Sequence, residues 1–170
     1  MMQKPLVGAL LGALGFAVAA AAPAATVNHI QAPALGHLSS SALAQRLGMD
    51  PQASLAPGLQ LRTVHGTVKT RENQLFRGVP VYGRSVVVER DATGNVRSVE
   101  GHLSNGLGFD LASVTPRLSG AAAVAALRQH VGLLPYGIGA NAVSDASLQN
   151  VKHDLYVYAE GKKAQLVYLT

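Results

Sequence analysis

Hydrophobic and polar positions divide the chain into segments of different character, and the first is apolar throughout. Residues Leu6–Ala22 form an unbroken run of Leu, Val, Gly, Ala and Phe, and Lys4 is the only charge before Arg46. A short basic region, an apolar stretch and small residues at its end are typical of a secretory signal peptide. We expect residues 1–24 to be this signal, cleaved at a site such as Ala22-Pro23-Ala24, so that membrane contact is transient and the chain is secreted or periplasmic. A retained membrane anchor is the alternative, since the run approaches the ~20 residues that span a bilayer.

The next segment, residues 25–58, is rich in Ala, Ser, Pro, Gln and Gly. One patch, Ser39–Leu47, has apolar residues at helical spacing, and Pro51 and Pro57 then interrupt the pattern. This composition predicts a flexible N-terminal arm that precedes the folded region.

From Leu59 onwards β-branched and polar residues alternate, which predicts strands. Leu61–Val68 is extended in type. Ser85–Glu89 and Val96–Leu103 flank the turn sequence Asp91–Asn95, which predicts a β-hairpin. The apolar positions of the second hairpin strand do not fall on one face, so the pattern leaves its register open.

The last part of the chain predicts a helix and two strands. Ser119 can cap an Ala-rich amphipathic run that ends at Gly132, so we expect a helix over 119–131. Residues 151–159 and 164–170 predict two strands joined by a tight turn. The last strand is apolar and nothing follows to cover it, so we expect a sheet whose remaining strands are missing.

Composition narrows the chemistry that the chain can perform. Its 170 residues include no Cys, which excludes disulfides, zinc fingers, iron–sulfur clusters and thiol nucleophiles. The formal net charge is +5, but the basic residues from Arg62 to Arg97 are spread out, so nucleic acid is not an expected partner. The positive charge could serve to bind an acidic protein partner. The alternative is that these basic residues contact only solvent.

Catalytic motifs are absent from the sequence. None of the six His is followed by Glu or lies four residues from another His, so there is no H-E-x-x-H, and G-x-S-x-G does not occur. We therefore expect no catalytic, cofactor-binding or metal-binding residues in this chain, and no enzyme activity. A composite metal site of His residues that are distant in sequence stays open, although surface or structural roles are the simpler expectation.

One ordered motif in the strand-rich region resembles a known family. The residues that carry the resemblance are Arg71, Gln74, Phe76, Gly78, Pro80, Val81, Tyr82, Gly83, Asp91, Gly94 and Gly101. In this order they resemble the fungalysin/thermolysin propeptide domain, where such residues maintain the propeptide's own fold and belong to no catalytic site. Pro80 cannot donate to a β-ladder, so we expect an edge or a bend there. The helix and strands after residue 115 resemble the start of a PepSY domain.

The resemblance implies a fold and a function. The fold is α+β: a curved antiparallel sheet with a packed helix, cystatin-like, over 59–114, followed by an incomplete PepSY unit over 115–170. The implied function is that of a secreted propeptide, an intramolecular chaperone and temporary inhibitor of the catalytic domain of a thermolysin-like zinc metalloprotease. We expect a fragment of that precursor, with zinc and calcium only in the missing catalytic domain. The alternative is a free-standing secreted or periplasmic protease-inhibitor or binding module.

Overall fold

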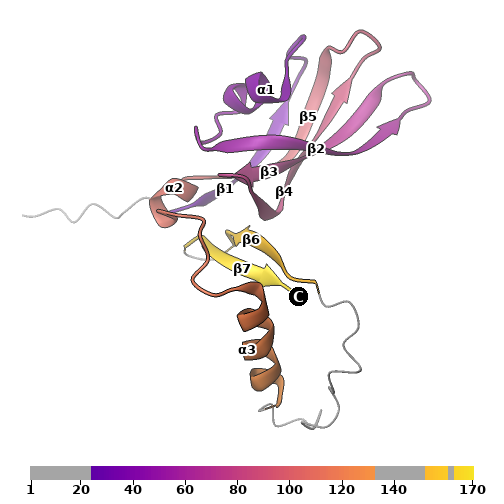
Figure 1. Ribbon diagram of the computed structural model, residues 1–170. Coiled ribbons are helices and arrows are strands. Elements are labelled where there is room, and N and C mark those ends of the chain that lie inside the picture. Colours follow the sequence, from indigo (N-terminus) through magenta and orange to yellow (C-terminus); the bar gives the residue numbers. More distant parts are fainter. Residues whose placement is uncertain (1–23, 133–151, 161–162) are drawn as a thin grey trace, which may run out of the picture.

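A computed structural model describes residues 24–132, 152–160 and 163–170 (Figure 1). Within these ranges the strands are β1 (Thr26–Ala32), β2 (Ala53–Arg62), β3 (Val68–Phe76), β4 (Val79–Arg90), β5 (Val96–Asn105), β6 (Asp154–Tyr158) and β7 (Gln165–Leu169). The helices are α1 (Ser40–Arg46), α2 (Leu107–Asp110) and α3 (Gly120–Gly132). The predicted signal peptide, apart from Ala24, lies outside the described residues. In the part of the chain that is described, no helix is long and apolar enough to cross a membrane.

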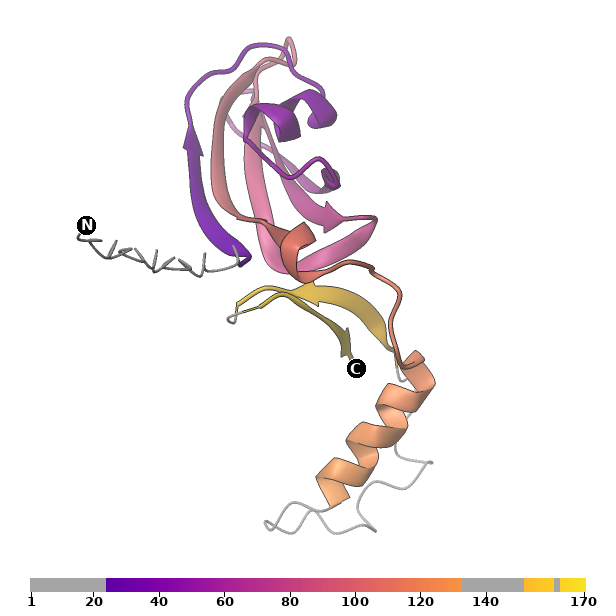
Figure 2. The same cartoon turned by 90° about the vertical axis from the view of Figure 1, so that its left-hand side faces the viewer.

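Five strands form an open antiparallel sheet in the order β1-β5-β4-β3-β2. Hairpins connect β2 through β5 in sequence, while α1 lies in the connection that carries the chain from β1 at one edge to β2 at the other (Figures 1 and 2). A second hairpin, β6–β7, joins β4 through the parallel pair Val81 and Val157. The mixed, strand-rich and unclosed architecture confirms the α+β expectation at this level.

The helix α1 closes one face of the sheet. Ser39 caps it, since its Oγ accepts a hydrogen bond from the Ala42 backbone N–H at 3.3 Å. Leu43 is fully buried. The buried side chains that form this core with it are Ala44, Met49, Leu55, Val86, Val88, Val96, Val99 and Leu103.

The expectation of a flexible arm over 25–58 is wrong for the structure. This segment contributes strand β1, helix α1 and the beginning of β2. Ile30 and Ala32 pack against the first core, and Leu43 lies in it. The apolar residues of this segment are few and lie among Ala, Ser and Pro, so they give little evidence of a folded region in the sequence. β1, α1 and the start of β2 each bury one side only through tertiary packing. The proposed domain boundaries themselves stay a prediction.

The predicted hairpin over 85–103 is confirmed, and a β-bulge explains its unsorted pattern. Arg90 pairs with Val96, but Glu89 pairs with Ser98, so Arg97 is an extra residue in β5. One inserted residue shifts the alternation of side chains. Val96 and Val99 consequently face the same core, which a regular strand would not allow.

The extended run predicted over Leu61–Val68 is broken by a turn. The Thr63 backbone N–H donates to the Thr67 carbonyl at 2.9 Å, and Gly66 has φ +79°. The run is therefore the end of β2, a turn and the start of β3.

A second core lies below the sheet, where α2, β4 and the β6–β7 hairpin meet (Figure 1). Its buried members are Phe76, Val81, Leu107, Leu111, Val157, Ala159 and Ala164. The expected helix over 119–131 is confirmed as α3, whose Ser119 Oγ accepts from the Ala122 N–H at 3.2 Å. Gly120 begins this helix directly against the His153 side chain, where any Cβ would overlap the ring.

Candidate interaction surface

The motif residues 71–83 cover the end of β3, a tight turn and the beginning of β4. Phe76 pairs with Val79, so Arg77 and Gly78 are the whole loop between them. Both have positive φ, +48° for Arg77 and +82° for Gly78, as a type I′ turn requires. Gly78 meets this requirement at no steric cost, whereas a non-glycine residue rarely adopts it.

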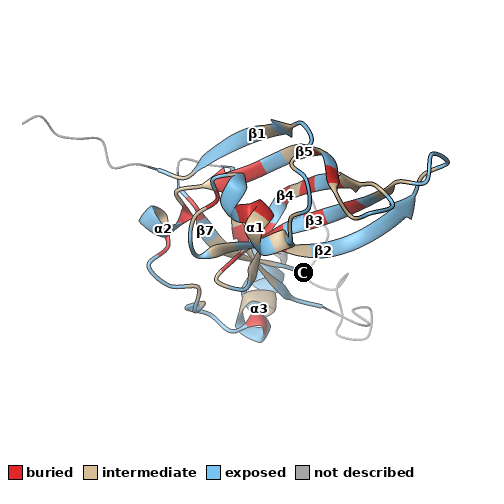
Figure 3. Cartoon of the chain, turned by 90° about the horizontal axis from the view of Figure 1, so that it is seen from above, coloured by how far each residue is buried: buried red, intermediate tan, exposed pale blue. Residues whose placement is uncertain are grey.

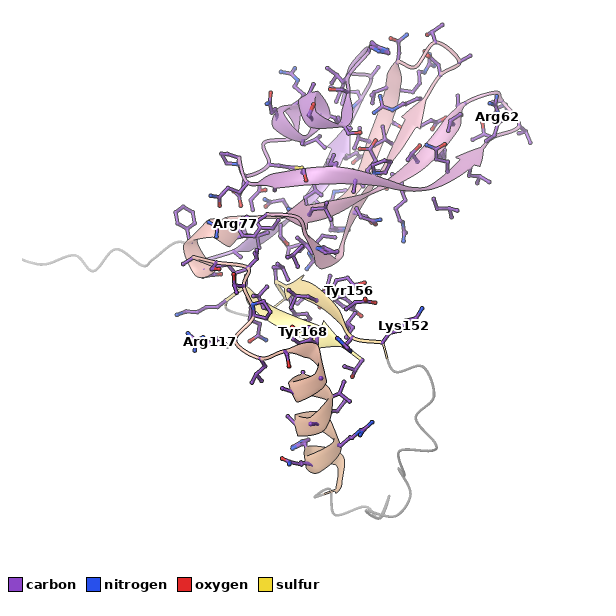
Figure 4. All side chains as sticks on the ribbon, viewed as in Figure 1. Arg62, Arg77, Arg117, Lys152, Tyr156 and Tyr168 are labelled. Atoms are coloured by element: carbon purple, nitrogen blue, oxygen red, sulfur yellow. The ribbon has the colours of Figure 1, made fainter. Side chains whose placement is uncertain are left out.

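The side chain of Arg77 stabilises that turn. Its Nε donates to Gln52 Oε1 at 3.1 Å, and its Nη1 donates to the carbonyl oxygens of Leu111 (3.3 Å) and Ala112. The guanidinium carbon lies 5.1 Å from the centre of the Phe76 ring. Arg77 thus links the turn to the segment that follows α2 (Figure 4). Sequence reasoning missed this residue, whose only signal is its place before Gly78 in a two-residue loop.

Strand β4 bends within the motif. Asn73 pairs with Ser85, but Leu75 pairs with Pro80, so residues 81–84 of β4 oppose a single residue of β3. Pro80 pairs with Leu75 and is the last residue of β4 before this bulge, a position that tolerates a residue without an N–H. The proline therefore stands at the point where β4 leaves the main sheet.

The bend turns β4 towards the second hairpin. Val81 is buried beside Val157 of β6, and the exposed Tyr82 ring lies 6.0 Å from that of Tyr156 and 6.1 Å from that of Tyr158. The motif residues Val81 and Tyr82 are thus contacts between the main sheet and the β6–β7 hairpin.

Gln74 replaces the ladder bonds that the bend removes. It is fully buried, its Nε2 donates to the Ser104 carbonyl at 2.6 Å, and its Oε1 accepts from the Ser104 N–H at 2.8 Å. Ser104 Oγ also accepts from Arg84 Nε at 3.0 Å, and Arg84 forms an ion pair with Glu160 at 3.3 Å. Gly83, with φ +67°, precedes Arg84 in the bulge. This polar network connects β3, β4, β5 and the segment that follows β6.

Replacing Gln74 by methionine is expected to lower the free energy of unfolding by about 2 kcal/mol, because the buried N–H and C=O of Ser104 lose their partners. Urea unfolding monitored by circular dichroism measures this. The matched control is Gln60→Met on the exposed part of β2, for which we expect a change within about 0.5 kcal/mol. Equal effects of the two substitutions would contradict the bridging role.

Asp91 organises the β4–β5 turn. Its Oδ1 accepts from the Thr93 hydroxyl at 2.7 Å and from the backbone N–H groups of Thr93 and Asn95, each at 3.0 Å. The Thr93 hydroxyl bond and then the Asn95 backbone bond lower the pKa of Asp91 from 3.8 to about 2. Gly94 adopts φ +86° in the same turn.

The lowered pKa of Asp91 predicts a pH-dependent contribution to stability. Because the pKa is depressed on folding, the contribution is present above about pH 3.8 and is lost as the pH falls towards about 2. We expect Asp91→Ala to be less stable than the wild type at pH 6 and the difference to shrink through that window. Urea titrations at several pH values test this, and a difference that stays constant down to pH 2 would contradict it.

The face of the sheet opposite α1 is open, and the motif residue Arg71 lies on it. Arg71 pairs with Val87, Val87 with Glu100, and Glu100 with Gln31, so these residues form a row across four strands. All four are exposed, whereas Val86, Val88 and Val99 belong to the core that contains Leu43 of α1. Figure 3 shows buried positions on α1 and on the central strands of the sheet. Nothing in the described ranges covers this row.

The tip of the β2–β3 hairpin carries exposed apolar side chains. Leu59, Leu61 and Val64 are 81%, 65% and 96% exposed. Arg62 lies at this tip, which projects away from the rest of the protein (Figure 4). Several large apolar residues exposed within one short segment mark an interaction site more often than a solvated loop.

The base of the tip is held by polar contacts. The Thr67 hydroxyl donates to Glu89 Oε1 at 2.7 Å, and Lys69 Nζ lies 3.6 Å from Glu89 Oε2. The Thr67 bond, followed by the charge of Lys69, lowers the pKa of Glu89. These contacts fix the hairpin beside β4 and leave its apolar tip outside.

Two aspartates connect the elements below the sheet. Asp50 accepts from the N–H groups of Gly106 (3.2 Å) and Leu107 (3.0 Å) at the start of α2. Asp110 Oδ2 accepts from those of Ala25 (3.2 Å) and Ala164 (2.8 Å). Both carboxylates therefore have structural explanations.

A cleft of about 630 Å³ lies between the segment after α2 and the β6–β7 hairpin. Its lining includes Asp110, Arg117, Leu155 and Tyr168, and the Tyr168 hydroxyl donates to the Leu118 carbonyl at 3.1 Å. The described residues contain no group of three or more His, Asp or Glu side chains that could hold a metal ion.

The bent β3–β4 hairpin and the Asp91 turn lie in one stretch of sequence that has known counterparts, as do Gln74 and Arg84 of the polar network. Residues 61–103 match the Fungalysin/Thermolysin Propeptide Motif. This match defines the class: the chain carries propeptide sequence of a thermolysin-like protease precursor, as the resemblance implied. In particular, the chain is 32% identical over 126 residues to the Hemagglutinin/proteinase of Vibrio cholerae serotype O1. The aligned region covers 74% of this chain and 20% of that protein. The chain thus spans about one fifth of the length of this relative.

Proposed function

We propose that this chain is the exported propeptide of a thermolysin-like zinc metalloprotease, and that it acts as an intramolecular chaperone and temporary inhibitor by binding the catalytic domain. The observation that carries the proposal is the propeptide motif over 61–103, together with the similarity to a bacterial proteinase precursor. A partner that binds the native protease better than unfolded forms stabilises it by mass action. This needs no catalytic residue in the propeptide, and we propose none.

The surface proposed to bind the catalytic domain is the open face of the sheet and the adjoining β2–β3 tip. The face offers Arg71 and Val87 at its centre, and the tip offers Leu59 and Leu61. With Arg62 beside the apolar tip and a chain charge of +5, the complementary patch on the protease is apolar with an acidic rim.

The finer assignments belong to the same proposal. The five-stranded sheet with α1 corresponds to a cystatin-like propeptide domain, and α3 with β6 and β7 to the first part of a PepSY domain. Export by residues 1–24 is proposed from their charge and hydropathy pattern. Zinc and calcium bound only by a catalytic domain follow from the resemblance. Most of residues 1–24 lie outside the described part of the chain.

A refolding experiment tests the proposal. Denatured mature proteinase of the Vibrio cholerae relative, and a second thermolysin-like protease, are refolded with and without the purified chain. We expect higher recovered activity with the chain, and inhibition of the native enzymes when it is added in excess. Inhibition without a refolding gain would favour the free-standing inhibitor. Absence of both effects with both proteases would contradict the proposed function.

Introducing negative charge at the apolar tip is expected to weaken this binding. The double variant Leu59→Asp/Leu61→Asp should raise the inhibition constant about tenfold or more, because it places two carboxylates in an apolar contact. The matched control is Phe109→Asp on α2, which removes a side chain that is 70% exposed but lies away from the tip. Equal weakening by both variants, measured by titrating inhibition, would show that the tip is not the contact.

A further inference from the structure

Two histidines that are far apart in the sequence face each other on the outer part of the sheet. His29 of β1 and His102 of β5 are direct register partners in the antiparallel β1–β5 pair. Their ring centroids are 5.0 Å apart and the ring planes are inclined by 58°. Both side chains are exposed, on strands that lie side by side at one edge of the sheet (Figure 3).

Within the described part of the chain, the recorded contact of each ring is the other ring, with neither an ion pair nor a hydrogen bond. Ser85 pairs with His102 on its other side, and one step along the same face Glu100 pairs with Gln31. Direct cross-strand partners have Cβ atoms about 4.5–5.5 Å apart, so the β1–β5 register holds the two imidazoles side by side in the folded sheet.

The geometry fits two ligands of one metal ion. Imidazole nitrogens bind Zn²⁺ at about 2.0–2.1 Å, so two rings on one ion have centroids roughly 5 Å apart and planes that are not parallel. Neutral imidazole suits Zn²⁺, Cu²⁺ and Ni²⁺, whereas Mg²⁺ and Ca²⁺ take oxygen ligands. Since no third such ligand converges with these two in the described residues, water would complete the coordination sphere.

We propose that His29 and His102 form a two-histidine chelate for a divalent transition-metal ion of the Zn²⁺, Cu²⁺ and Ni²⁺ group. The site is assembled only when β1 pairs with β5, so the ion binds the folded sheet and stabilises it relative to the unfolded chain. β1 is an edge strand, bonded along its length to β5 and at its start through the Ala25 N–H to Asp110 at 3.2 Å. The ion adds a cross-link in the middle of this edge.

Calorimetric titration of the purified chain, free of any affinity tag, tests the chelate with Zn²⁺ and Ni²⁺ as probes. We expect one ion per chain, and His29→Gln and His102→Gln should each weaken Zn²⁺ binding at least about tenfold, because one imidazole then holds the ion alone. Zn²⁺ should also raise the Tm of the wild type and leave that of both variants unchanged. Mg²⁺ at the same concentration should do neither.

The matched control is His65→Gln. His65 is an exposed histidine in the β2–β3 turn, on the far side of the sheet from β1. This variant should bind Zn²⁺ within about twofold of the wild type, and circular dichroism checks that all variants are folded. A loss smaller than tenfold in either pair variant, or an equal loss in His65→Gln, would overturn the proposal. The test needs no protease, so its outcome is independent of the proposed function.

Discussion

Gly101→Ala is expected to lower the free energy of unfolding by about 3 kcal/mol or more. Gly101 lies in β5 opposite Val86 of β4 and Ile30 of β1, with φ +153°. An alanine Cβ at this position would overlap the Ser85 carbonyl oxygen and lie 2.8 Å from the Val86 Cα. Both obstacles are backbone atoms, so no change of rotamer relieves them. The strands must separate, and the core on the α1 side loses its packing with them.

Urea unfolding of the wild type and Gly101→Ala measures the loss, and the yield of soluble protein serves where the variant does not fold. The matched control is Gly108→Ala, since a Cβ at Gly108 meets only Gln52 Oε1 at 3.5 Å. We expect the control to stay within about 0.5 kcal/mol of the wild type. A loss below about 1 kcal/mol for Gly101→Ala would show that β4 and β5 separate easily, against the close approach described above.

Gly101 also illustrates what sequence could predict and what it could not. Its membership of the motif followed from order and spacing, and the hairpin followed from two β-branched runs around Asp91–Asn95. The sequence could not show why a glycine is needed there, because the reason is the short distance between the backbones of β4 and β5. Likewise, Val96 and Val99 face the same core only because Arg97 is an inserted residue. No local sequence pattern predicted this β-bulge.

Long-range partners explain most of the remaining differences. Outside the helical patch at 39–47, residues 25–58 lacked a periodic pattern, because β1 buries only part of one side against a strand that comes later in the chain. Gln74 was a motif residue without a physical role until its two bonds to Ser104 were seen. The His29–His102 pair is invisible to spacing rules, since register alone brings the rings together. The sequence pattern thus predicted most of the elements and the motif, whereas the roles of the individual residues depend on tertiary pairing.

Arg90→Met is expected to lower the free energy of unfolding by about 3–5 kcal/mol, which is typical of removing one partner of a buried ion pair. Arg90 Nη2 lies 3.4 Å from Glu72 Oε1, and the side chain of Glu72 is only 3% exposed. Arg90 also donates to the Leu38 carbonyl at 2.8 Å, which connects the segment before α1 to the sheet. Without the guanidinium, Glu72 is a buried carboxylate whose other oxygen, Oε2, already has no hydrogen-bond partner in the described structure.

The double variant Arg90→Met/Glu72→Leu distinguishes two costs: the loss of the Arg90–Glu72 ion pair, and the burial of the Glu72 carboxylate without a partner. It should recover most of the stability lost by Arg90→Met, because apolar replacement of a whole buried pair is often neutral. The control is Lys69→Met, which breaks the exposed Lys69–Glu89 pair between the same two strands and should cost about 1 kcal/mol or less. If the double variant is no more stable than Arg90→Met, the bond from Arg90 to Leu38 is the dominant contribution. The attachment of the α1 segment to the sheet would then depend on that one arginine rather than on the apolar core.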